Sequence, residues 1–158
     1  MFLAIIGDAS TEADARYVDE LKRLTRTLDL GMKVIFQSWV EKEELWKIFG
    51  AADLVILPSL KEGMPNVLLE ALGCDIPCFG SNIPGIRDIL CHDELMFDPG
   101  DEEALAEKIS RFFSDVHQSV RIIQFCRERK KKFIFDWKQQ VFQLVAKGTA
   151  SADKHKPT

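Results

Sequence analysis

The sequence predicts an α/β fold, in which a doubly wound parallel sheet of about five strands is flanked by helices and followed by a helical C-terminal part. Short apolar runs alternate with helical patterns along the chain. The runs are short and mainly apolar, as in strands buried on both faces, and each is ended by Gly, Pro, Asp or Ser. Alternation of this kind favours parallel strands joined by right-handed helical crossovers. The predicted strands are residues 2–6, 33–37, 53–58, 77–81 and 94–98.

Capping residues and apolar spacing predict the helices between these strands. Thr11 and Asp14 form a capping pattern before the first helix, and Gly31 lies where that helix should end. Asp101 opens a later helix with acidic residues at its positive end. Residues 116–147 are predicted to be helical throughout. The apolar side of the first helix carries Tyr17, Val18, Leu21, Leu24 and Leu28, and that of the second carries Leu45, Ile48 and Phe49.

Size and composition predict one globular domain. The chain has 158 residues, of which 46% are hydrophobic and 29% charged, enough to build a core. We assign residues 1–147 to this domain and the polar segment 148–158 to a disordered tail.

A net charge of -4 argues against nucleic acid as a partner. No apolar run reaches the ~20 residues of a membrane span, and the first residues lack the basic region of a signal peptide. We therefore expect a cytoplasmic protein.

The cysteines are expected to be buried and reduced. Pairing or zinc binding is the alternative, but no C-x-x-C occurs and three of the four cysteines lie beside apolar residues. The four are Cys74, Cys78, Cys91 and Cys126.

The segment that follows strand 53–58 is the candidate binding site, because parallel sheets bind ligands at the carboxyl ends of their strands. Pro58, Gly63 and Pro65 shape this connection, and Gly63 allows a ligand to approach the backbone closely. Pro65 suits the first turn of a helix, where its missing N–H would be unpaired in any case.

The helix that starts here predicts an anion site. The free amides of Asn66, Val67 and Leu68 should point out of its N-terminus, beside the positive end of the helix dipole. Glu70 follows Asn66 by one helical turn, so its side chain should rise on the same face. A carboxylate near a phosphate is expected to accept hydrogen bonds from a neutral diol, as acidic residues do for ribose in dinucleotide sites.

The motif PSLKEGMPNVLLEALGCDIPCFGSNIPGIRDIL, with an E-x7-E pair inside it, resembles the donor-binding domain of family 4 (group 1) glycosyltransferases. These are retaining, nucleotide-sugar-dependent enzymes of the two-domain GT-B type. The resemblance extends to FLAIIGD, VIFQSWVEKEELWKIFGAADLVILPS and MFDPGDEEALAEKI. It implies a Rossmann-like domain that binds a nucleotide-diphosphate sugar.

The resemblance also implies roles for individual residues. Glu62, the proposed catalytic residue, and the backbone of Gly63, Met64 and Pro65 would hold the hydroxyls of the donor sugar. The amides of residues 66–68 would bind the diphosphate, and Glu70 the ribose. The segment QSWVEKEEL matches the nucleobase loop, so that Trp39 and Val40 would flank the base, although Ser38 stands where the family usually has Gly. The alternative for Trp39 is packing, which is also the interpretation of Trp46 and Trp137.

The mechanism implied by the family needs no metal and no protein base. A phosphate oxygen near the reacting face would accept the acceptor's proton, and catalysis would consist of positioning and stabilisation of the departing diphosphate. The sequence has no D-x-D pair for a divalent cation. As an alternative, Glu62 would act as a covalent nucleophile.

The sequence departs from the family pattern at its start. It lacks the strand and helix that carry an Arg and a Lys against the diphosphate, and the N-terminal acceptor domain. We therefore expect a fragment or one half of a split enzyme, inactive without a partner domain, with an open edge on strand 2–6. The alternative function is a non-catalytic nucleotide-sugar-binding or interaction module, and a GT-B epimerase is a weaker alternative.

The basic run 127–132 is interpreted as a solvated helix face, or as a weak contact with anionic lipid headgroups.

Overall fold

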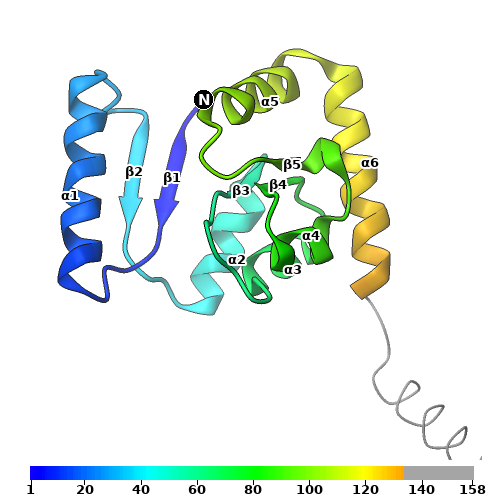
Figure 1. Cartoon of the computed structure of the whole chain (residues 1–158), viewed down its shortest axis with the longest axis horizontal. Helices are drawn as coiled ribbons and strands as arrows, with labels where there is room; N and C mark the ends of the chain where they lie inside the picture. Colours follow the sequence, from blue (N-terminus) through cyan, green and yellow to red (C-terminus); the bar gives the residue numbers. More distant parts are fainter. Residues whose placement is uncertain (134–158) are drawn as a thin grey trace, which may run out of the picture. The chain divides into compact units, whose positions relative to one another are not determined.

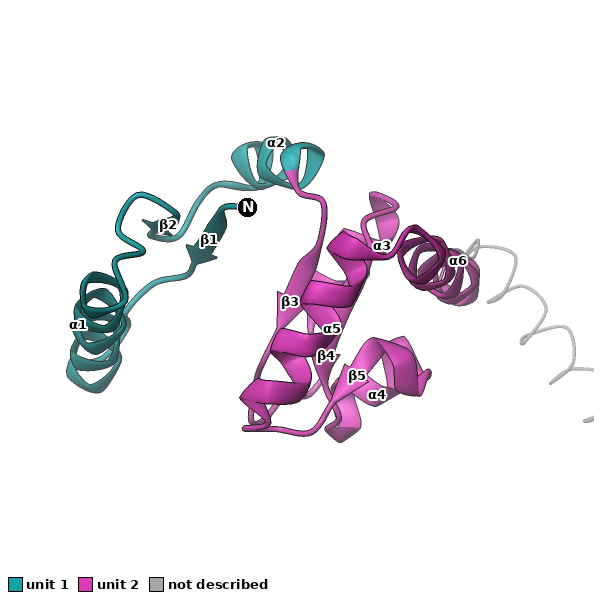
Figure 2. Cartoon of the chain, turned by 90° about the horizontal axis from the view of Figure 1, so that it is seen from above, with its two compact units in different colours: residues 1–51 teal, residues 52–158 magenta. Residues whose placement is uncertain are grey.

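The structure, a computed structural model, describes residues 1–133 (Figure 1). The chain forms two compact units, unit 1 at residues 1–51 and unit 2 at residues 52–158 (Figure 2). The predicted helix end at residues 134–147, the predicted tail at 148–158 and Trp137 lie outside the described residues.

Unit 1 is a β-α-β-α segment. Strands β1 (Leu3–Ile6) and β2 (Val34–Gln37) are parallel, with Leu3 opposite Val34 and Ile6 opposite Gln37. Helix α1 (Glu12–Thr27) connects them and α2 (Lys42–Ala51) follows β2. The predicted capping box starts α1, because the Asp14 N–H donates to Thr11 Oγ1 at 3.2 Å and the Thr11 N–H donates to Asp14 Oδ2 at 2.9 Å.

Unit 2 contains a three-stranded parallel sheet in the order β3-β4-β5. The strands are β3 (Val55–Leu57), β4 (Cys78–Ser81) and β5 (Met96–Phe97). The helical elements are α3 (Asn66–Gly73), α4 (Pro84–Leu90), the 3-10 helix η1 (Asp93–Leu95), α5 (Glu102–Ser114) and α6 (Val116–Phe133).

The α/β class and the parallel strands are confirmed, and the described strands divide between two sheets. β1 pairs with β2, and β3 pairs with β4; within the described residues neither has a second partner. Along a strand, the backbone N–H and C=O groups of successive residues point alternately to the two sides. The Leu3 N–H donates to the Lys33 carbonyl beside β2, and the Val55 N–H donates to the Pro77 carbonyl beside β4. The backbone groups of Ala4 and Ile56 therefore face open edges.

The core of the described chain lies in unit 2, around the central strand β4, all four residues of which are buried. Phe79 is 1% exposed and meets Phe112 edge to face, with 6.1 Å between ring centroids. Helix α1 has no buried residue. Tyr17 and Leu24 of its predicted apolar side are 61% and 51% exposed, because unit 1 presents only a two-stranded sheet to cover them.

Helix α6 is fastened to the rest of unit 2 by part of its basic run. Arg129 donates from Nε to the Ile89 carbonyl and from Nη2 to the Asp88 carbonyl, at the end of α4. Lys130 Nζ lies 2.7 Å from Asp75 Oδ2. The interpretation of the whole run as a solvated face is therefore wrong for Arg129 and Lys130, since both make tertiary contacts that the helical pattern does not reveal.

The cysteines are free, and their burial differs from the expectation. Cys78 and Cys126 are buried, whereas Cys74 and Cys91 are exposed at the ends of α3 and α4. The Cys78 N–H donates to Cys126 Sγ at 3.3 Å. A side-chain hydrogen bond with Cys126, together with burial, raises the pKa of the Cys78 thiol, whereas hydrogen bonds from the side chain and the backbone of Cys78 lower the pKa of Cys126.

Candidate functional site

The candidate site lies at the carboxyl ends of β3 and β4 in unit 2. The loop 58–65 leaves β3 and leads into α3, and residues 82–83 leave β4 and lead into α4. Parallel sheets of this kind bind ligands at such strand ends. Buried Pro65 anchors the end of the loop where α3 begins. The sheet therefore places the loop and the two helix starts at one edge.

Glu62 is held in a defined position by a contact that the sequence analysis missed. Its side chain is half-buried, and Ser59 Oγ donates to Glu62 Oε1 at 2.8 Å. The second carboxylate oxygen has no hydrogen-bond partner within residues 1–133. Ser59 lies three residues before Glu62 in a loop that starts with Pro58, and this spacing is the sequence signal for such a local hydrogen bond. The free oxygen can accept a hydrogen bond from a ligand.

The N-terminus of α3 offers two free amides rather than three. Pro65 precedes the helix and provides no side-chain cap. The Leu68 N–H donates to the Pro65 carbonyl at 3.2 Å, and the Leu68 side chain is 0% exposed. The expectation of a free Leu68 amide is therefore wrong, because the first turn closes on itself. The N–H groups of Asn66 and Val67 have no partner in the described part of the chain, so the anion site rests on these two.

Glu70 is half-buried on the first turns of α3. Its carboxylate makes no hydrogen bond or salt bridge with any residue in the range 1–133. Because a helix places residues four apart on one face, Glu70 shares a face with Asn66. A carboxylate without a protein partner beside free amides can bind the hydroxyl groups of a ligand whose phosphate lies at the helix end.

The start of α4 touches the loop directly. A Cβ atom placed on Gly85 would lie 2.0 Å from the Gly63 carbonyl oxygen and 2.8 Å from the Glu62 carbonyl oxygen. Gly85 itself is buried. No role is predicted for Gly85 from the sequence, because nothing in the sequence shows which backbone it meets.

Trp39 and Val40 belong to unit 1, in the connection between β2 and α2. Trp39 is 63% exposed, so the packing interpretation of this residue is wrong; its ring remains available to a ligand. Val40 is 9% exposed and therefore buried. Trp46 meets Phe49 edge to face at 6.0 Å between ring centroids but is 40% exposed, so the packing interpretation holds only for one face of its ring.

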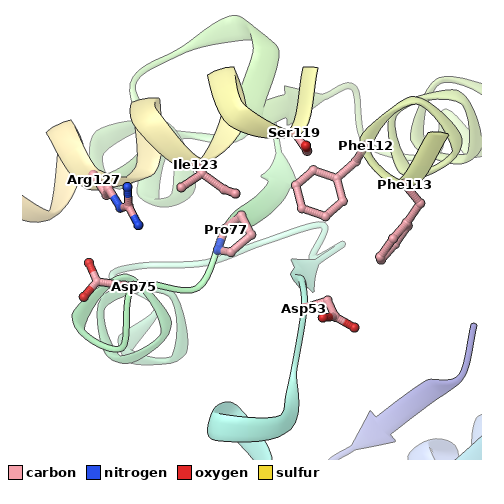
Figure 3. A pocket seen from close by; sticks show the side chains of 8 residues that line it. All are labelled: Asp53, Asp75, Pro77, Phe112, Phe113, Ser119, Ile123 and Arg127. Carbon is pink, nitrogen blue, oxygen red and sulfur yellow. The ribbon is translucent and has the colours of Figure 1, made fainter. Parts of the chain in front are cut away.

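A separate hollow of about 370 Å³ lies at the opposite ends of these strands (Figure 3). Asp53 and Pro77, which precede β3 and β4, line it together with Phe112 and residues of α6 such as Ile123 and Arg127. None of the predicted site residues lines this hollow. Its place at the amino ends of the strands argues against a role as the ligand site of this fold.

Residues 1–133 contain no group of three or more His, Cys, Asp or Glu side chains arranged to hold a metal ion. The helices described in this range also include none that is both long and apolar enough to span a bilayer.

The chain is similar to a large group of sugar-transferring proteins. Residues 1–129 match the family model described as glycosyl transferases group 1. The sulfoquinovosyl transferase SQD2 of Arabidopsis thaliana is 28% identical over 141 residues, which cover 86% of this chain and 25% of that protein.

Two solved structures share the fold. HepE of Anabaena, in complex with UDP-glucose, superposes with a TM-score of 0.75 at 24% identity, over 95% of this chain and 41% of HepE. The C-terminal domain of a group 1 glycosyl transferase (LpcC) from Francisella tularensis gives a TM-score of 0.74 at 23% identity, over 84% of this chain and 69% of that domain. The chain spans 16% to 32% of the length of the curated relatives that it matches.

Proposed function

The chain belongs to the group 1 glycosyltransferases, and from this premise we propose that it is the donor-binding part of a retaining enzyme that moves a sugar from a nucleotide-diphosphate sugar to an acceptor. The observation that carries the proposal is the arrangement after β3. Glu62 is held by Ser59, while Asn66, Val67 and Glu70 of α3 present two free amides and a carboxylate without a protein partner.

Each part of this arrangement suits one part of a nucleotide sugar. The α3 amides and the helix dipole bind the diphosphate, which carries the negative charge. Glu70 accepts hydrogen bonds from the ribose hydroxyls. Glu62 and the backbone of Gly63, Met64 and Pro65 bind the hydroxyls of the sugar. For Trp39 and Val40 of unit 1 we keep the role beside the base that the family resemblance implies, and the exposed ring of Trp39 supports this role for Trp39.

In this proposal the protein contributes positioning and charge stabilisation to the reaction. The amides of Asn66 and Val67 stabilise the diphosphate as the sugar leaves it. A donor phosphate oxygen accepts the proton of the acceptor hydroxyl, and no metal takes part. The hydrogen bond from Ser59 withdraws charge from the Glu62 carboxylate, which favours a hydroxyl-binding role for Glu62 over a covalent one. Sugar transfer that persists in a metal chelator would agree with this scheme.

We also propose that sugar transfer requires polypeptide beyond this chain, such as a partner domain. The small share of each relative that the chain spans supports this view. The open edges of β1 and β3 also support it, because apolar strand edges without charges or prolines invite pairing. Sugar transfer by the purified chain alone would refute this part of the proposal. We further propose that the protein is located in the cytoplasm, which cell fractionation would test.

Calorimetric titration tests donor binding directly. UDP, GDP and ADP, with UDP-glucose, GDP-mannose and ADP-glucose, would be titrated into the wild-type chain, Glu70→Ala and the control Glu103→Ala, an exposed carboxylate on α5. We expect selective binding of one base that Glu70→Ala weakens about tenfold or more, since a hydrogen bond to a charged group contributes roughly 1.5–3 kcal/mol. Glu103→Ala should bind like the wild type. A folded chain that binds none of the six would favour a non-catalytic interaction module instead.

A further inference from the structure

The first turn of α4 lies against the backbone of the loop that carries Glu62. A Cβ atom on Gly85 would stand 2.0 Å from the Gly63 carbonyl oxygen and 2.8 Å from the Glu62 carbonyl oxygen. Real Cβ atoms essentially never come closer than 3.0 Å to such atoms. Both contacts are backbone atoms, which cannot rotate away as the end of a long side chain does. Any residue other than glycine at position 85 must therefore displace the loop or the helix.

The helix is the less movable of the two. Ile86, Ile89 and Leu90 of α4 are at most 1% exposed, and a Cβ atom on Gly80 of β4 would lie 2.5 Å from Ile86 Cγ2. Arg129 of α6 holds the C-terminal end of α4, because it donates hydrogen bonds to two of the last carbonyls of that helix. The loop has few such attachments, because Gly63 and Met64 are exposed. A side chain at position 85 would therefore move the loop.

We propose that Gly85 is a positioning residue for the sugar end of the donor site. By direct contact it sets where the Glu62–Gly63 backbone lies, and so where the Glu62 carboxylate meets the donor sugar. This inference rests on the proposed function. Gly85 should have no effect on the nucleotide end of the site, where Asn66, Val67 and Glu70 lie on α3. The three atoms nearest to a Cβ on Gly85 all belong to the loop, and none belongs to α3.

The proposal predicts a divided effect on binding. Gly85→Ala should weaken the nucleotide sugar about tenfold, the loss expected when roughly one or two sugar hydrogen bonds are misplaced. The matching nucleoside diphosphate should bind within about twofold of the wild type. A general loss of structure would weaken both ligands equally. The control Gly73→Ala adds the same methyl group at the end of α3, where a Cβ atom would meet nothing within 4 Å, and should change neither affinity.

The experiment titrates UDP and UDP-glucose into the full chain, with the GDP and ADP pairs in parallel, and measures amide hydrogen exchange without ligand. Faster exchange confined to residues 59–65 in Gly85→Ala, with the divided binding effect, is the expected result. Equal weakening of both ligands, or unchanged binding and unchanged exchange, would overturn the proposal. If the wild type binds no nucleotide sugar, the proposed function fails, whereas the exchange measurement still decides whether Gly85 positions the loop.

A second variant covers the case in which Gly85→Ala does not fold. Arg129→Gln keeps Gly85 but removes the charged ties at the end of α4, so the helix should become a less rigid support for the loop. We expect the preference for the nucleotide sugar to fall in the same direction, by about twofold to threefold, with faster exchange in residues 59–65. Unchanged preference and unchanged exchange in Arg129→Gln would overturn the proposal.

Discussion

Arg129 links α6 to the C-terminus of α4, and its replacement measures how much this contact stabilises the fold. Its Nε donates to the Ile89 carbonyl at 2.6 Å and its Nη2 donates to the Asp88 carbonyl at 2.8 Å. The last carbonyls of a helix have no partner inside the helix. A cation at that end also interacts favourably with the helix dipole. Arg129→Ala removes both hydrogen bonds and the charge.

The expected loss follows from the burial of the two hydrogen bonds. A hydrogen bond from a charged donor contributes roughly 1.5–3 kcal/mol. The bond to Ile89 is part-buried and should keep most of this value, whereas the bond to Asp88 is exposed, where water competes for the same groups. We therefore expect Arg129→Ala to lower the free energy of unfolding by about 2 kcal/mol.

Urea unfolding followed by circular dichroism tests this value. The matched control is Lys131→Ala, because Lys131 is an exposed cation on the same helix with no hydrogen bond or salt bridge in the described part of the chain. The control should stay within about 0.5 kcal/mol of the wild type. The midpoint for Arg129→Ala should fall with little change in the slope. If both variants lose the same stability, the reasoning about α4 is wrong.

Three further predictions follow from burial and from the site. Phe79→Ala should lower the free energy of unfolding by about 3–5 kcal/mol, because Phe79 is 1% exposed, whereas Tyr17→Ala should have little effect; equal losses in urea unfolding would contradict the burial argument. An aromatic disulfide reagent should react quickly with Cys74 and Cys91 in the native chain and with the two buried thiols only after unfolding; fast native labelling of all four would be inconsistent with the core. Ser59→Ala should weaken a nucleotide sugar about fivefold in calorimetry without weakening the nucleoside diphosphate, since it frees the Glu62 side chain, and an equal effect on both ligands would contradict this assignment.

Local features of the fold were predictable from the sequence because their causes lie within a few residues. The capping box of Thr11 and Asp14 involves two residues three positions apart, and the structure contains it. The strands appear within about two residues of their predicted bounds, since apolar runs ended by turn residues determine them locally. The start of α3 after Pro65 has the same origin.

Parts of the candidate site could not be predicted, because they depend on how distant segments meet. The contact between Gly85 and the Gly63 carbonyl joins the first turn of α4 to the loop before α3, and the chain separates these two segments by α3 and β4. The Leu68 amide was expected to be free, and the turn it closes with Pro65 depends on the tightness of the first helical turn. The exposure of Trp39 depends on which side chains cover it, and no sequence pattern specifies that.

The sequence by itself determined the α/β class, the order of strands and helices, the membership of the group 1 glycosyltransferases and the segment that carries the candidate site. These properties follow from periodicity, capping and motifs, which are local in the chain. Only the tertiary structure decided which strands pair, which basic residues hold α6 in place, and which backbone supports Glu62. The physical reason is that pairing, burial and close packing are set by groups that come together only when the chain has folded.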